Sequence, residues 1–109
     1  MAKKNRLPPF VALYKELLRD SNWRSLSFSA MVIYVYMRGK FNTSTFSEVS
    51  LAYSEMKDMM STKTMSKAFK ELQKKGFIVK TKHGGLYGGV CKYKFIGQFR
   101  HFHYKGYRV

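Results

Sequence analysis

Lysines and short hydroxyl side chains recur between positions 62 and 70, and both kinds of group bind phosphate. Lysine ammonium groups donate to phosphate oxygens and other acceptors, and small hydroxyls approach them closely. The free backbone N–H groups of a helix that begins near Ser61 would add a preference for an anion. The candidate contact residues of this segment are Thr62, Lys63, Thr64, Ser66, Lys67 and Lys70.

A second set of candidate contacts surrounds a glycine-rich segment. Four glycines flank Leu86 and Tyr87. Glycine readily adopts the positive φ angles of tight turns, and it lets backbone N–H groups approach a phosphate. The candidate contacts here are Lys80, Lys82, His83, Gly84, Gly85, Tyr87, Lys92 and Lys94.

A helix is predicted to position the first set. Apolar residues recur at steps of three and four, which is typical of one buried helix face. This apolar stripe consists of Met65, Ala68, Phe69 and Leu72. Ser61 is a suitable N-cap, and Gly76 suits the left-handed position just after the last turn.

A β-hairpin is predicted to position the second set. Residues alternate in polarity over 77–82 and again over 90–96, with the glycines between them. A short helix at 54–60 precedes Ser61 and gives the helix, turn and helix of a DNA-binding motif. The helix that begins after Ser61 would then be the recognition helix, and the hairpin that follows it would be the wing. This order of elements predicts a winged helix-turn-helix.

The segment from Ser61 to Ile78 resembles bacterial winged-helix DNA-binding proteins. It shares their order of cap, polar residues, apolar residue, Ser, basic residue, Ala and apolar residue, followed by Leu, Gly and Ile. The likeness covers about residues 25–96. This part of the chain is also similar to the winged-helix domains of plasmid and phage replication initiators. It implies that the recognition helix enters the major groove and that the wing contacts the minor groove or the backbone.

Composition agrees with a polyanion-binding domain. The 109 residues include 21 lysines and arginines against 6 acids, which gives a net charge of +15. From position 60 onward twelve residues are basic and only Glu71 is acidic. The positive charge therefore lies mainly on the predicted recognition helix, wing and tail, where it attracts polyanions.

Length and cysteine content indicate one domain in a reducing compartment. The chain is 45% hydrophobic and 17% aromatic, so it can form a core, and it has one cysteine. No apolar run approaches the roughly 20 residues of a membrane span, and no secretory segment follows the basic start. We expect a cytoplasmic protein.

The other segments complete the predicted domain. Residues 1–7 form a basic arm, residues 8–96 the winged helix-turn-helix domain, and residues 97–109 an aromatic and basic C-terminal extension in which a strand is permitted. A helix from Pro8-Pro9 to about Arg19 is an addition at the N-terminus.

Three further elements form the expected core. Ser27 caps a helix over about 28–38, and Trp23 is an anchor between helices. A short strand over 48–51 would pair with the hairpin. Ser54 caps the short helix at 54–60, whose Met56, Met59 and Met60 we expect in the core.

Metal and catalytic chemistry have less support in the sequence. His83, Cys91, His101 and His103 do not match a paired zinc signature, and we expect no metal site and no cofactor. The chain has neither a phosphate-binding GK[ST] loop nor a recognisable triad, so we expect no enzyme. Cys91 is expected to be a small core residue.

The sequence thus predicts a mainly α fold with a small antiparallel sheet, and sequence-specific binding of double-stranded DNA. A transcriptional regulator or a replication-associated factor of a bacterium, plasmid or phage fits this prediction. The sequence is compatible with a homodimer through the N-terminal helix or the C-terminal tail, and also with a monomer. The alternatives are a winged-helix protein-interaction module and RNA binding, with bases stacked on Tyr87, Tyr93, Phe99, Phe102 and Tyr104.

Overall fold

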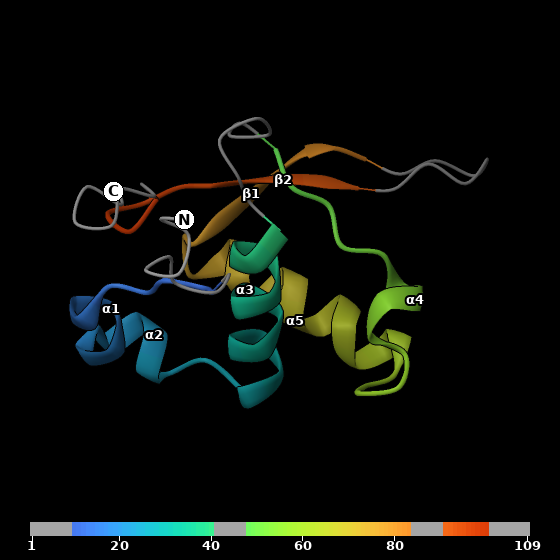
Figure 1. The fold of residues 1–109 in the computed structure, drawn as a ribbon, viewed down its shortest axis with the longest axis horizontal. Helices are drawn as coiled ribbons and strands as arrows, with labels where there is room; N and C mark the ends of the chain where they lie inside the picture. Colours follow the sequence, from blue (N-terminus) through green and yellow to red (C-terminus); the bar gives the residue numbers. More distant parts are fainter. Residues whose placement is uncertain (1–9, 41–47, 84–90, 101–109) are drawn as a thin grey trace, which may run out of the picture.

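A computed structural model describes residues 10–40, 48–83 and 91–100 (Figure 1). Its elements are α1 (Lys15–Arg19), α2 (Ser21–Arg24), α3 (Phe28–Lys40), α4 (Tyr53–Met56), α5 (Thr62–Lys74), β1 (Ile78–Lys82) and β2 (Lys92–Phe95). The fold is mainly helical with a two-stranded antiparallel sheet, as predicted, and it is compatible with a winged helix-turn-helix. Within these ranges no helix has the length and apolar content needed to cross a bilayer.

The predicted recognition helix is α5. Ser61 is its N-cap, with the side-chain oxygen accepting from the backbone N–H of Thr64 at 3.1 Å. The four residues of the apolar stripe are all buried. Gly76 follows the helix with φ of +84°, the left-handed conformation that favours glycine. These features confirm the predicted start, buried face and end of the helix.

The packing of α5 against α3 forms the centre of the molecule, with α3 in front of α5 and the hairpin crossing above both (Figure 1). A carboxylate joins the two helices at one end. Glu71 of α5 accepts from the backbone N–H of Ser27 at 2.8 Å and from its hydroxyl at 2.7 Å. The Ser27 hydroxyl in turn accepts from Ala30 N–H, so the predicted cap of this helix is confirmed.

Tyr34 of α3 is the centre of an aromatic cluster that connects α2 with the hairpin. Its ring lies 5.3 Å from Trp23, 5.6 Å from Phe77 and 5.4 Å from Phe95, each time edge to face. This is the favourable arrangement for aromatic pairs. Burial raises the pKa of the Tyr34 hydroxyl, and the nearby Arg38 opposes this effect. Trp23 therefore has the anchoring role that the sequence predicted.

Arg38, the last residue of the helix predicted over about 28–38, is a buried charge that the sequence did not indicate. Its guanidinium lies 4.3 Å from the centre of the Phe95 ring and donates to the Tyr34 hydroxyl and to the Phe99 carbonyl. The helix continues to Lys40 because Arg38 is held in the core and Lys40 pairs with Glu55 at 2.6 Å. Phe99 is also buried, so the start of the expected C-terminal extension packs on the domain.

The hairpin packs one face on the helices. Ile78 pairs with Phe95, and Lys80 pairs with Tyr93. The Tyr93 ring stacks on Phe69 of α5, with centroids 4.8 Å apart. The strand expected at 48–51 is reduced to one antiparallel bridge, in which Val49 and Tyr93 exchange both backbone hydrogen bonds at 2.8 Å.

The predicted N-terminal helix is wrong over its first half. Residues 10–14 are not helical, and α1 begins only at Lys15. Val11 lies against Gly39 of α3 and Leu13 packs on the core, so tertiary contacts hold this segment in another conformation. Asp20, expected to interrupt the helix, caps α2 by accepting from two backbone N–H groups.

The helix expected at 54–60 is also shorter than predicted. It ends at Met56, and its cap is Ala52 instead of Ser54, because the Glu55 carboxylate accepts from the Ala52 N–H at 2.9 Å. Met56 is buried, but Met59 is 52% exposed and does not belong to the core.

The strand permitted after residue 96 is absent from the described residues 97–100, which form a turn closed by a bond from Arg100 N–H to the Gly97 carbonyl.

Replacing Glu71 with Ala should weaken the junction between α3 and α5. The change removes two bonds from a charged acceptor, and we expect a loss of about 1–2 kcal/mol in the free energy of unfolding. Urea unfolding followed by circular dichroism measures it. Asp58→Ala, which removes the same charge from an exposed turn, is the control. Equal effects of the two changes would contradict the role of Glu71.

Two glycines with positive φ should respond differently to alanine. A Cβ at Gly76 would meet nothing within 4 Å, whereas a Cβ at Gly97, with φ of +86°, would lie 2.9 Å from the Gly76 carbonyl oxygen. We expect Gly76→Ala to cost about 1 kcal/mol of stability and Gly97→Ala roughly 2–3 kcal/mol. Thermal unfolding compares them, and the reverse order would rule out this close approach.

Candidate nucleic-acid interface

Four lysines form a single ridge on the outer surface of α5. Successive helix residues are rotated by about 100°, so positions separated by three, four, seven and eleven residues share one side. The ridge consists of Lys63, Lys67, Lys70 and Lys74, and all four are exposed. It lies directly opposite the buried stripe and extends for about 16 Å along the helix.

The hydroxyl residues of α5 lie on two different sides of the ridge. Thr62 and Ser66 are on the side of Phe69, whose ring stacks on β2, and so they flank the ridge towards the hairpin. Thr64 is on the opposite side, half-buried, and its hydroxyl accepts from the cap residue Ser61 at 3.1 Å. Of the predicted hydroxyl contacts, Thr64 thus belongs to the cap of the helix.

The single acid of α5 lies at the edge of the ridge and is bound to another element. Glu71 is on the α3 side of the helix, where both carboxylate oxygens accept from Ser27. The positive potential of the ridge is therefore not reduced by an ion pair with this carboxylate. A surface of this kind favours a ligand with regularly spaced negative charges.

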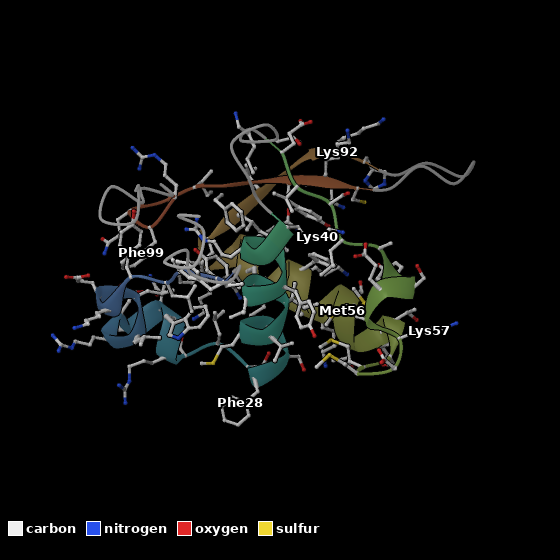
Figure 2. All side chains as sticks on the ribbon, in the orientation of Figure 1. Phe28, Lys40, Met56, Lys57, Lys92 and Phe99 are labelled. Atoms are coloured by element: carbon white, nitrogen blue, oxygen red, sulfur yellow. The ribbon has the colours of Figure 1, made fainter. Side chains whose placement is uncertain are left out.

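The hairpin lysines lie on different faces. Tyr93 and Phe95 face the helices, so the intervening Lys92 and Lys94 lie on the outer face. Figure 2 shows Lys92 on the side of the hairpin away from the helices. Lys82 pairs directly with Lys92 across the strands, beyond a bulge in β1. Because α5 packs beneath the sheet, Lys92 and Lys94 are not on the same surface as the ridge.

The remaining predicted wing contacts divide into two groups. Lys80 is half-buried on the inner face, and its ammonium nitrogen lies 3.5 Å from Nδ1 of the exposed His83. Gly84, Gly85 and Tyr87 lie outside the described residues. Lys82 and His83 are therefore the described wing residues nearest the predicted tip.

Glu55 joins the start of α4 to the end of α3. Its carboxylate accepts from the Lys40 ammonium at 2.6 and 2.8 Å and from the Ala52 N–H. The hydrogen bond from Lys40 lowers the pKa of the Glu55 carboxyl group most, and the hydrogen bond from the Ala52 backbone lowers it further. Met56 next to it is completely buried (Figure 2). The backbone N–H groups of Met59 and Met60 donate to the Met56 carbonyl and form the turn that leads to Ser61.

Other kinds of site are not evident in the part of the chain described here. No group of three or more potential metal ligands occurs among these residues. Cys91 is partly buried and packs on the core, as the sequence predicted. His101 and His103 of the metal alternative lie outside the described ranges. No protein-family model, curated protein or solved structure matches the chain.

The cross-strand pair Lys82–Lys92 predicts a gain in stability when its repulsion is removed. Like charges directly opposite each other destabilise a sheet, so Lys82→Glu should raise the free energy of unfolding by about 0.5 kcal/mol. Urea unfolding tests this. Lys57→Glu makes the same charge change on an exposed turn without a cross-strand lysine. A gain no larger than that of the control would contradict the pairing.

Proposed function

We propose that this protein binds double-stranded DNA with sequence preference, as a transcriptional regulator or replication-associated factor of a bacterium, plasmid or phage. It would act in the cytoplasm as a binding protein without a cofactor, in the manner of the winged helix-turn-helix superfamily. The observation that carries the proposal is the exposed lysine ridge on the face of α5 opposite its buried stripe.

The dimensions of α5 support duplex DNA as the ligand. A helix with side chains is about 10–12 Å across, and the major groove of B-DNA is about 12 Å wide. Lysines spaced along about 16 Å of helix can reach phosphates on both sides of the groove. The helix end at Ser61 adds backbone N–H groups that favour a phosphate.

Two hydroxyl residues are the best candidates for reading sequence. Thr62 and Ser66 flank the N-terminal part of the ridge towards the hairpin, and in helix-turn-helix proteins this part of the helix contacts base edges. Lysine can also donate to guanine acceptors, and Lys63 and Lys67 are the ridge members in this half. Lys70 and Lys74, in the later turns, would contact phosphates.

The burial of two aromatic residues favours a duplex over single-stranded RNA. Tyr93 is 4% exposed and stacks on Phe69, and Phe99 is 7% exposed. Neither ring is available to stack a base. The other three stacking candidates, Tyr87, Phe102 and Tyr104, lie outside the described residues.

The test is duplex binding measured by fluorescence anisotropy over a series of salt concentrations. Replacing Lys63, Lys67 and Lys70 together with Ala should weaken binding and lower the slope of log K against log salt by about 3. The matched control replaces Lys15, Arg19 and Arg24, three exposed residues of α1 and α2, so that net charge falls equally.

An equal loss in both triple variants would show that binding depends only on net charge, and the proposed site would be wrong. Selection of duplexes from a random pool then tests sequence preference. We expect Thr62→Ala or Ser66→Ala to change the selected sequence, whereas Lys74→Ala should weaken all duplexes alike. A pool without any enriched sequence would contradict sequence-specific binding.

A further inference from the structure

The outward face of α3 is apolar and uncharged. Phe28, Val32 and Tyr36 are separated by four residues and so lie in one row along the helix. Phe28 is 82% exposed and Tyr36 is 45% exposed, and Val32 is partly buried. No charged residue occurs between Phe28 and Met37. The solvent face of a helix in a monomeric domain normally carries charged side chains.

This face is separate from the proposed DNA interface. The other side of α3, with Ile33 and Met37, is fully buried and packs towards α5. In Figure 1 α3 lies in front of α5. The ridge of α5 lies opposite its buried stripe and therefore faces away from the core. Figure 2 shows Phe28 projecting from the end of α3, away from the other elements. A ligand on the ridge would leave the row on α3 exposed.

We propose that this face binds a second copy of the chain, with the two α3 helices antiparallel about a two-fold axis. The charge of the protein is the first reason. Each copy carries +15, so contacts through its basic surfaces would place like charges within a Debye length of about 8 Å at physiological salt. The row on α3 is a face on which two copies can meet without opposing charges.

Shape is the second reason, because the two ends of the face complement each other. Phe28 and Gly39 lie at equal distances, about 8 Å, from the midpoint of the segment 28–39. In an antiparallel pair, Phe28 of one copy therefore lies over Gly39 of the other. Gly39 has no side chain, and Val11, 41% exposed, lies 3.2 Å from the position of a Cβ there. The large ring thus meets an apolar surface formed by the Val11 side chain beside the Gly39 backbone.

The middle of the face also pairs with itself. The same two-fold arrangement sets Val32 of one helix opposite Val35 of the other, and both are partly buried against their own core. β-Branched side chains of this size allow two helices to approach to about 8–10 Å. The contact is isologous, as expected of a two-fold dimer. It does not depend on the proposed DNA binding.

Sedimentation equilibrium over a range of protein concentrations tests the dimer directly. We expect a monomer–dimer equilibrium that strengthens with added salt, because salt screens the repulsion between two positively charged copies. Phe28→Ala should raise the dimer dissociation constant about tenfold or more. Met59→Ala is the matched control, since Met59 is an exposed apolar residue on the turn after α4.

Thermal unfolding of the Phe28→Ala monomer should match that of the parent monomer, because the side chain is exposed and its loss leaves the core intact. A second change, Val32→Lys, should abolish the dimer by adding a charge at the centre of the face. A protein that is monomeric at every concentration, or a dimer that Phe28→Ala and Met59→Ala weaken equally, would overturn the proposal.

Discussion

The direction of the lysine ridge depends on the packing of α5 against α3. Because Met65, Ala68, Phe69 and Leu72 are buried in this contact and against β2, the rotation of α5 about its axis is fixed. The polar residues at the intervening positions are then necessarily exposed. The Glu71 carboxylate at Ser27 stabilises the same contact from its edge, with both of its oxygens accepting hydrogen bonds from Ser27.

The remaining core serves to hold these two helices and the hairpin together. Tyr34 packs against Trp23 of α2, Phe77 just before β1 and Phe95 of β2, and Arg38 attaches the turn at Phe99 to the same cluster. The buried guanidinium is accommodated by a hydroxyl, a carbonyl and an aromatic face, which replace part of its hydration. As a result, charge and apolar surface are separated. The exposed surface of α5 carries the lysine ridge, and the outward row of α3 carries uncharged residues.

The sequence predicted α5, its cap, its buried stripe and the following hairpin because these depend on local features of the chain. The features are apolar residues at steps of three and four, alternating polarity, and single glycines. The prediction failed at 10–14 and at Met59, where tertiary contacts decide the outcome, and it did not indicate the burial of Arg38. The sequence marks Glu71 only as the single acid from position 60 onward, and no local pattern indicates its bond to Ser27, 44 positions away. The exposed face of α3 was also missed, since an apolar helix reads as buried all round.

The site was predictable only in part for the same reason. Helical spacing predicts that Lys63, Lys67 and Lys70 share a side, and the structure agrees. Period-two alternation places Lys92 and Lys94 together, but only the packing of Tyr93 on Phe69 shows that they face away from α5. Lys82 is paired with Lys92 and so lies on the same outer face of the hairpin, whereas Lys80, paired with Tyr93, lies on the inner face.

Backbone amide resonances recorded during titration with a short duplex would test most directly whether α5 is the binding surface. We expect the largest chemical-shift changes at 62–70, smaller changes near Lys82 and His83, and none along the outward face of α3. Changes concentrated on α1 and α2, with the amides of 62–70 unaffected, would contradict the assignment of α5 as the helix that binds DNA.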